Sequence, residues 1–324
     1  MGLRAYVLLW GGLGVVSLAG GNTTEPLDEA RQLIAELQMR TCSPASAAHR
    51  MQTLGVQKGA AVLLLEMLQK PMEAPTQQRL VDLLVLLSQP ISAYYFLNSL
   101  KGEDAYLRMS AAKALGQLRV KEALPGLVSM LEDERLALRR EAATALGRLK
   151  QKAAQEPLLA ALQVEPEPEA REQMLWALGL LEAKKHLSVI QGFLTHSSES
   201  TRWAAARALL AMGEASGWKW LKPHLNSQES GECAQALHSL QEAVPSKSWK
   251  AEALVLLRGM MQEREAPLAA QAAVLAACWG DKSARLWLEK RVEQSEGMEV
   301  SIYEEALAKV QQVLGGVASK EKRH

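Results

Sequence analysis

The stretch Arg108-Met109-Ser110-Ala111-Ala112-Lys113-Ala114-Leu115-Gly116 decides the fold, because it returns three more times along the chain. It returns as residues 139–147 and, in weaker form, from Arg171 to Gly179 and from Arg202 to Leu209. The four leading arginines lie 31, 32 and 31 positions apart. A fixed period of this length is typical of stacked supersecondary units that bury their apolar faces only against their neighbours. The sequence therefore predicts an elongated solenoid.

Each unit is expected to contain a helix, a short turn and a second helix. In the unit that starts at Arg108, the first helix should end near Leu118 and the second should run from Ala123 to Leu131. The corresponding second helices are predicted at 154–162, 186–194 and 217–225. This register aligns two apolar columns, which consist of Leu127, Leu158, Ile190 and Leu221, and of Leu131, Leu162, Leu194 and Leu225.

The repeats weaken toward both ends of the chain, as expected of terminal units that face water on one side. Helical spacing still predicts a capping helix at 27–39 and later helices at 254–261, 269–278, 285–292 and 302–314. We therefore predict four segments, namely a signal peptide at 1–19, a leader and capping helix at 20–44, the repeat solenoid at 45–314 and a flexible basic tail at 315–324.

The first residues are typical of an export signal. Arg4 precedes an apolar run from Tyr6 to Leu18, and Ser17-Leu18-Ala19 matches a cleavage site with small residues. The run is shorter than the roughly 20 residues that a membrane span needs. We expect an exported protein, in a bacterial periplasm or outside the cell; if residues 1–19 are retained, the chain is a membrane-tethered adaptor.

Charge argues against a general nucleic-acid binder. Without residues 1–19 the chain has equal numbers of basic and acidic side chains, since this segment contains Arg4 and no acidic residue. A nucleic-acid binder needs a basic face that neutralises phosphates. We therefore expect a protein or peptide partner and no nucleic acid.

The repeated phrase R-x-x-A-A-x-A-L-G-x-L, with a Leu-rich second helix after it, resembles the HEAT-like repeat of the phycobilin-lyase type. The best examples are Arg108–Leu118 and Arg139–Leu149. The resemblance implies an all-α fold, a right-handed superhelical solenoid of HEAT-like helical hairpins, with first helices on the convex side and second helices on the concave side. Proteins with such repeats include scaffolds, adaptors and a minority of enzymes, so the resemblance is specific for the fold and unspecific for function.

The repeated arginines and glycines are expected to be structural. One arginine per unit can bind a carboxylate or the carbonyls of a turn with its planar guanidinium group, and so set the register between units. This predicted ladder consists of Arg108, Arg139, Arg171 and Arg202. The glycines at the end of the phrase either let helices approach closely or end the first helix with a positive φ.

A tryptophan-rich stretch is the best candidate for a binding site. Trp218 falls in a column of the repeat that predicts packing, whereas Trp220 points to another side of the same helix. An exposed tryptophan with a cationic rim is typical of a binding hot spot. The predicted partner-binding residues are Trp220, Lys219, Lys222 and His224; the alternative is that Trp220 fills a gap between units.

The sequence offers no candidate for catalytic or metal-binding chemistry. None of the six histidines is followed by glutamate, so the iron-binding pairs of HEAT-like hydroxylases are missing, and no metal-ligand or nucleophile motif occurs. HEAT-like DNA glycosylases are a weak alternative, because they use aromatics on the concave face. Cys233 and Cys278 fall at alanine-like positions and are expected to be small buried residues; with Cys42 they suggest no disulfide.

The sequence thus predicts an exported, non-catalytic scaffold or adaptor without cofactor or metal that binds a protein or peptide on its concave face. The main alternative is an enzyme or enzyme accessory of the lyase or chaperone type on the same scaffold. An acidic side chain buried beside an apolar pocket on the concave face would favour that alternative.

Overall fold

The computed structural model describes residues 25–321, with side chains described for 27–313. Within this part of the chain every regular element is a helix, so the all-α prediction is confirmed. The predicted signal peptide and the first residues of the leader lie outside the described range. No helix in that range is both long enough and apolar enough to cross a membrane.

The chain divides into two compact units with the boundary after Val120. The described helices of the first unit are α2 (Glu25–Gln38), α3 (Pro44–Thr53), α4 (Gln57–Met67), α5 (Ala74–Leu87), the 3₁₀ helix η1 (Pro90–Ser92), α6 (Ala93–Ser99) and α7 (Ala105–Leu118). In this unit α5 packs against α2, α3, α4 and α7, and α6 packs against α7.

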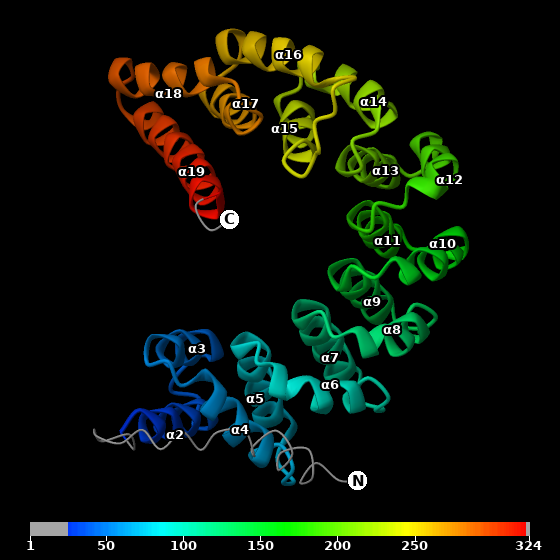
Figure 1. The fold of residues 1–324 in the computed structure, drawn as a ribbon, viewed down its shortest axis with the longest axis vertical. Helices are drawn as coiled ribbons and strands as arrows, with labels where there is room; N and C mark the ends of the chain where they lie inside the picture. Colours follow the sequence, from blue (N-terminus) through cyan, green and yellow to red (C-terminus); the bar gives the residue numbers. More distant parts are fainter. Residues whose placement is uncertain (1–24, 322–324) are drawn as a thin grey trace. The chain divides into compact units, whose positions relative to one another are not determined.

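The second unit is a continuous series of helical hairpins (Figure 1). Its helices are α8 (Leu124–Met130), α9 (Leu136–Leu149), α10 (Gln155–Val164), α11 (Pro168–Leu180), α12 (Leu187–Gly192), α13 (Glu199–Ala211), α14 (Ala215–Leu225), α15 (Ser230–Ser239), α16 (Lys250–Glu263), α17 (Ala266–Cys278), α18 (Lys282–Gln294) and α19 (Met298–Glu321). Short 3₁₀ turns precede α8, α10 and α12, and another follows α12. The predicted second helices at 123–131, 154–162, 186–194 and 217–225 correspond to α8, α10, α12 and α14.

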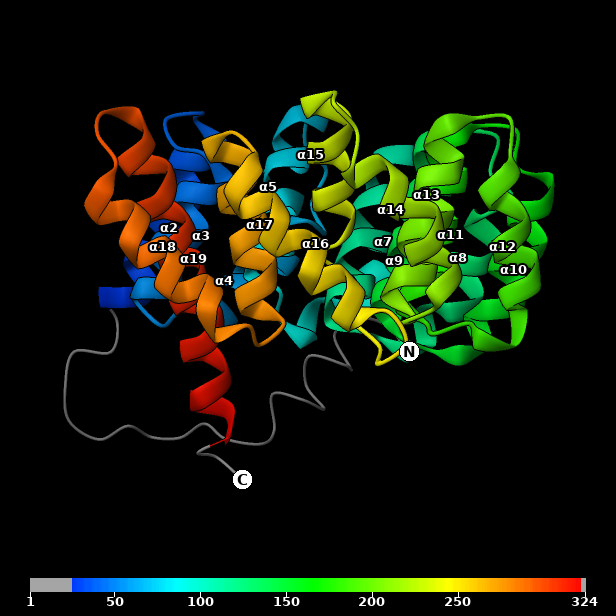
Figure 2. The ribbon, with the colours of Figure 1, turned by 90° about the horizontal axis from the view of Figure 1, so that it is seen from above.

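The helices of this unit form two rows. Figure 1 shows α9, α11 and α13 along the inner side of the curve, continued by α15 and α17, whereas α8, α10, α12, α14 and α16 form the outer row. The packing of α11 against both α9 and α13 agrees with this order, and Figure 2 shows successive helices lying side by side. The first helices of the repeats therefore line the concave side of this unit, opposite to what the resemblance implies.

Small residues explain why the first helices form the inner row. A Cβ atom added at Gly147 would lie 3.0 Å from the Cα of Ala177, and one added at Gly179 would lie 3.0 Å from the Cα of Ala208. Helices that touch backbone to backbone lie closer to their neighbours along the stack than the leucine-rich second helices do. A stack of such hairpins therefore curves toward the row that contains the glycines and alanines. These two glycines lie inside their helices and serve close approach.

A left-handed residue follows the first helix eleven positions after each leading arginine. In successive repeats it is Arg119, Lys150, Glu182 and Gly213, with φ values of 52°, 55°, 51° and 78°. This conformation satisfies terminal carbonyls, for example through the bond from the Lys150 amide to the Gly147 carbonyl. The repeat thus uses a positive φ in its turn, mostly without glycine.

The core consists of the predicted columns together with alanines. Leu127, Leu158, Ile190 and Leu221 are fully buried, and so are the alanines of the repeated phrase. In the second column Leu194 is half-buried, while the other three members are buried. At the carboxyl end α19 continues to Glu321, so the predicted boundary at residue 314 falls inside a helix.

Candidate functional site

Trp220, the predicted hot-spot residue, lies on α14 in the outer row and is half-buried. Its ring packs edge-on against Trp203, with centroids 5.0 Å apart, and contacts the His224 ring at 4.4 Å. Trp218 on the same helix is buried and stacks on Trp249 at 5.5 Å. The two tryptophans therefore point to different sides of α14, as their spacing predicts.

The predicted cationic rim is largely paired with carboxylates. Lys222 forms an ion pair with Glu252, which also accepts a hydrogen bond from the Trp218 indole at 2.7 Å. These bonds lower the pKa of Glu252. His224 contacts Glu232, while Lys219 is exposed. The positive charge around Trp220 is therefore smaller than the sequence suggests.

Arg139 of the predicted ladder binds both a carboxylate and two carbonyls. Its Nε and Nη2 atoms donate to Glu165 at 2.8 Å each, and its Nη1 donates to the carbonyls of Asp133 and Glu134. Both side chains are mostly buried, with 13% and 2% of their surface exposed. The hydrogen bonds to Glu165 raise the pKa of Arg139. This arginine thus ties the start of α9 to the end of α10.

The next two arginines bind carbonyls in the same way, but with different side-chain partners. Arg171 donates to the carbonyls of Glu165 and Pro166 and to the hydroxyl of Thr201. Arg202 donates to the carbonyls of His196 and Ser197. The shared partners are main-chain carbonyls five and six residues earlier, rather than the nearby carboxylates. Arg108 occupies the equivalent place on α7.

Sequence reasoning missed two further arginines that bind main-chain carbonyls, in these cases of residues much earlier in the chain. Arg79 donates to the carbonyls of Leu37 and Cys42, and Arg264 donates to the carbonyl of Ser227. Because the phrase around both is eroded, only their position before an apolar helical run could have identified them.

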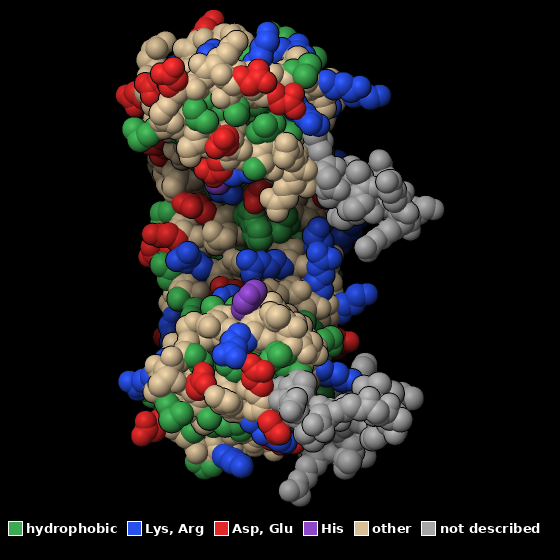
Figure 3. All heavy atoms as spheres, turned by 90° about the vertical axis from the view of Figure 1, so that its left-hand side faces the viewer, with side chains coloured by type: hydrophobic (Ala, Val, Ile, Leu, Met, Phe, Trp, Pro, Cys, Tyr) green, Lys and Arg blue, Asp and Glu red, His purple; other side chains and the backbone are tan. Residues whose placement is uncertain are grey.

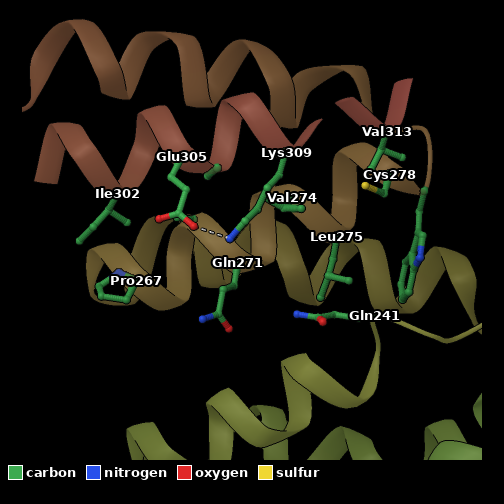
Figure 4. Close-up of a pocket in the computed structure, with 13 residues that line it drawn as sticks. Gln241, Pro267, Gln271, Val274, Leu275, Cys278, Ile302, Glu305, Lys309 and Val313 are labelled. Atoms are coloured by element: carbon green, nitrogen blue, oxygen red, sulfur yellow. Dashed lines mark ion pairs between the residues drawn. The ribbon is translucent and has the colours of Figure 1, made fainter. Parts of the chain in front are cut away.

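A groove lies between α17 and α19 of the second unit and extends to Gln241, two positions after the end of α15 (Figure 4). Its volume is about 610 Å³, within the range of roughly 300–1,000 Å³ that is usual for small-molecule sites. Apolar side chains form most of its lining, namely Pro267, Ala270, Val274, Leu275, Trp279, Ile302, Ala306 and Val313.

A few polar groups border this apolar surface. The amides of Gln241 and Gln271 line it, and Lys309 forms an ion pair with Glu305 at 2.8 Å, one turn apart on α19. Both charged side chains are exposed, so the acid beside the pocket is not the buried one that the sequence argument asked for. An apolar surface with a few convergent polar groups is typical of a ligand site.

Cys278 also lines the groove and is exposed, so the prediction that it is a buried small residue is wrong. It ends α17 on the side that faces α19, whereas Cys233 is buried as predicted. All three cysteines are free. Desolvation raises the pKa of the Cys278 thiol, which leaves it protonated near neutral pH and weakly nucleophilic.

The groove could not be derived from the sequence, because its lining comes from helices beyond the clear repeats. The signals present were the Ala-rich run of α17, the amphipathic pattern of α19 and the Glu305–Lys309 spacing. Each of these is equally typical of a capping hairpin. Among the described residues no group of histidine, cysteine and carboxylate side chains is arranged to hold a metal ion.

Charge on the surface is mixed. On the face drawn in Figure 3, basic and acidic side chains lie interspersed toward both ends, whereas basic side chains predominate across the middle.

Comparison with known proteins places the repeats in a family. A family model for HEAT repeats matches residues 95–172 and 155–241. The phycocyanobilin lyase subunit alpha of Synechocystis sp. is 41% identical over 117 residues, which cover 33% of this chain and 43% of that protein. The bilin biosynthesis protein PecE of Mastigocladus laminosus is 39% identical over 103 residues, which cover 32% of this chain and 38% of that protein. The chain thus spans about two fifths of the length of these curated relatives.

A solved structure agrees on the fold. The complex of CpcE and CpcF of phycocyanin lyase from Nostoc sp. aligns with a TM-score of 0.51 and 23% identity, over 77% of this chain and 94% of that chain. At this identity the likeness shows the fold alone.

These relatives correct two predictions. The sequence predicts a non-catalytic scaffold that is not an enzyme, yet the relatives at 41% and 39% identity are a bilin lyase subunit and a bilin biosynthesis protein. The non-catalytic interpretation is therefore wrong, and the lyase alternative is the better one. The expectation of a protein partner stays a prediction; the related structure is itself a complex of two proteins.

Proposed function

We propose that this chain, a HEAT-like repeat protein with repeats of the phycobilin-lyase type, is a subunit or accessory of a lyase-type enzyme that acts on a bilin-like ligand. The observation that carries the proposal is the 41% and 39% identity to proteins named for bilin chemistry. That identity covers only about a third of the chain. A protein with this function must also have a site that suits such a ligand.

The groove between α17 and α19 is that site. A bilin is an extended conjugated molecule with an apolar body, pyrrole N–H groups and two carboxylates. The apolar lining buries the body, the Gln241 and Gln271 amides offer hydrogen bonds to the polar edge, and the Lys309 ammonium group suits a carboxylate. The volume of about 610 Å³ suits such a ligand, whereas the cavity lined by Trp203 and Arg207, with about 120 Å³, has room for no more than a side chain. The cavity of about 500 Å³ beside Arg139 is large enough, but its lining includes four acidic residues, Glu132, Asp133, Glu134 and Glu165, whose charge opposes the carboxylates of a bilin.

In this proposal the chain binds and orients the ligand while a partner completes the enzyme. The groove removes one face of the ligand from water and leaves the other accessible for transfer to an acceptor. The protonated Cys278 thiol would not compete for the ligand as a nucleophile. We further propose that the partner is a second helical-repeat subunit.

The test is titration of the purified full chain with phycocyanobilin, followed by absorbance and by quenching of tryptophan fluorescence. Gln271→Trp fills the groove from an exposed position on α17, and we expect it to weaken binding at least tenfold. Gln262→Trp is the matched control, since Gln262 is also an exposed helical glutamine but lies outside the groove. Unsaturable binding to the wild type, or equal affinity of both variants, would contradict the proposal.

Trp220 remains our proposed contact for the protein partner. Its half-buried ring rests on Trp203 and His224, so truncation removes an anchor at the surface while the buried Trp218 keeps its stacking on Trp249. Trp220→Ala is expected to fold and to lose at least tenfold in partner affinity. A folded Trp220→Ala variant that captures the partner as well as the wild type does would show that Trp220 only fills a gap.

A further inference from the structure

A strap of eight residues, 241–248, forms most of the connection from α15 to α16 and lies against the end of α13. The amide of Val244 donates to the carbonyl of Leu210 at 2.9 Å, and the Trp249 indole donates to the carbonyl of Gly213 at 3.3 Å. The backbone of the strap is therefore fixed against the end of α13. Gln241, its first residue, lines the groove described above.

Glu242, the second residue of the strap, places its carboxylate between two side chains of the inner row. Its Oε2 atom accepts a hydrogen bond from the Trp176 indole Nε1 at 3.2 Å and one from Arg207 Nη2 at 3.3 Å. Trp176 and Arg207 occupy the same position of the repeated phrase, five residues after Arg171 and Arg202. Consecutive repeats thus direct an indole N–H and a guanidinium group at one carboxylate oxygen.

The contacts of Glu242 are of the kind that a ligand can replace. Both distances lie at the long end of the hydrogen-bond range. The side chains of Arg207 and Glu242 are 35% and 51% exposed, and exposed ion pairs contribute little to stability. Because the backbone is held at Val244, a rotation of the Glu242 side chain is enough to release the site.

A small cavity of about 120 Å³ adjoins Arg207 on the same inner row. Ser200, Gln235 and His238 line it and can donate hydrogen bonds, whereas Glu172 supplies an opposing negative charge. The cavity has room for a short arm and none for a whole ligand. The Glu242 side chain, which contacts Trp176 and Arg207 in this structure, is an ethylene chain that ends in a carboxylate. A propionate group has the same chemistry.

We propose that Trp176 and Arg207 form a receptor for a propionate-type carboxylate, which Glu242 occupies in this structure and which an incoming carboxylate displaces. This inference rests on the proposed function, because the propionates of a bilin are the source that it favours. The glutamate side chain of a partner protein carries the same group and is the other source.

The first measurement follows the Trp176 indole N–H signal by NMR, assigned with Trp176→Phe, while sodium propionate is added. Glu242→Gln removes the internal carboxylate, and we expect a saturable shift at a propionate concentration at least fivefold below that needed by the wild type. Glu242→Gln combined with Arg207→Gln should show no shift. Glu199→Gln is the matched control, because Glu199 accepts from the Trp203 indole within one helix and should leave the titration unchanged. An unresponsive signal in Glu242→Gln, or an equal response without Arg207, would overturn the inference.

The second measurement separates the two sources of carboxylate. Biliverdin and its dimethyl ester share one tetrapyrrole, but only the acid has free propionates. If the bilin is the source, Glu242→Gln should bind biliverdin at least threefold more tightly than the wild type and bind the ester no better. If a partner protein is the source, the Arg207-dependent gain should appear with a glutamate-containing peptide instead. If biliverdin does not bind at all, the proposed function is contradicted. The shift of the Trp176 signal with propionate would still show whether Trp176 and Arg207 bind a carboxylate.

Discussion

At the scale of single residues, one repeated position has several partners. Arg139, Arg171 and Arg202 all bind main-chain carbonyls of the preceding connection, but only Arg139 adds a two-point contact to a carboxylate. Arg171 reaches the Thr201 hydroxyl instead. The repeat therefore predicts the position of the guanidinium group, whereas the neighbouring side chain determines how strong its interactions are.

Arg139→Ala is expected to lower the free energy of unfolding by about 3 kcal/mol, because it leaves the buried Glu165 carboxylate without its partner. Arg140→Ala is the matched control, since Arg140 is the exposed adjacent residue of α9, and it should change stability by less than about 0.5 kcal/mol. Denaturant unfolding of the two variants measures the difference. Equal stability of both variants would show that the ladder has no structural role.

Asp281 gives a prediction on pH. The hydrogen bond from Arg258 lowers the pKa of this carboxylate below its ordinary value of 3.8, and Asp281 also caps α18 through the Ser283 amide. A lowered pKa contributes stability that is present above the unfolded-state value and is lost as the pH falls through the folded-state value. Asp281→Asn keeps the capping oxygen without the charge.

We therefore expect the difference in melting temperature between wild type and Asp281→Asn to be constant from pH 7 to about pH 5 and to shrink toward zero below 3.8. Thermal unfolding across this range measures it. A difference that stays the same at every pH would show that the charge of Asp281 does not contribute.

At the scale of helices, the inner row is built on close approach. Gly147 and Gly179 let α9, α11 and α13 touch along their backbones, while the outer helices stay apart on leucine side chains. This difference in spacing determines the direction in which the second unit curves, and so which helices present Trp176 and Arg207 on the concave side.

Gly179→Ala tests this packing. The new methyl group would lie 3.0 Å from the Cα of Ala208, where backbone cannot give way easily, and we expect a loss of roughly 1–3 kcal/mol. Gly259→Ala in α16 is the control: its Cβ meets nothing within 4 Å, so the better helix propensity should stabilise by up to about 1 kcal/mol. A Gly179→Ala variant as stable as the wild type would show that the inner helices can accommodate the extra methyl group without loss of packing.

At the scale of the whole molecule, the chain consists of two compact units that each stack helices along the sequence. Such units grow by addition, so an end hairpin can diverge without disturbing the rest. The last three helices, α17, α18 and α19, have done so. They close the core with Trp279 and Tyr303 and leave an apolar groove beside them.

The predicted export concerns the chain as a whole and remains a prediction. Expression of the full chain in a bacterium, isolation of the periplasm and amino-terminal sequencing should give a mature chain that begins after Ala19. A chain recovered with residues 1–19 intact in the membrane fraction would support the tethered alternative. A chain found only in the cytoplasm would contradict both.

The sequence by itself determined the repeat, the positions of the helices in the clear repeats and most of the core, because a period of about 31 residues and helical spacing are local patterns that recur in each unit. It could also predict that Trp218 packs and that Trp220 faces elsewhere, since both follow from their angle on one helix. The wrong prediction for Cys278 shows what the pattern cannot predict. A position that is alanine in other repeats is not necessarily buried, because burial depends on which element packs over it.

Only the tertiary structure decided which row is concave, which carboxylates pair with Lys222 and Arg139, and where the groove lies. Each depends on residues far apart in the chain, such as Glu242 and Trp176, 66 positions apart, which meet through a strap that interrupts the period. Local patterns specify an element, whereas the distance of closest approach between elements follows from all the side chains between them. That distance set the curvature, and the curvature places α11 and α13, with Trp176 and Arg207, on the concave side of the second unit.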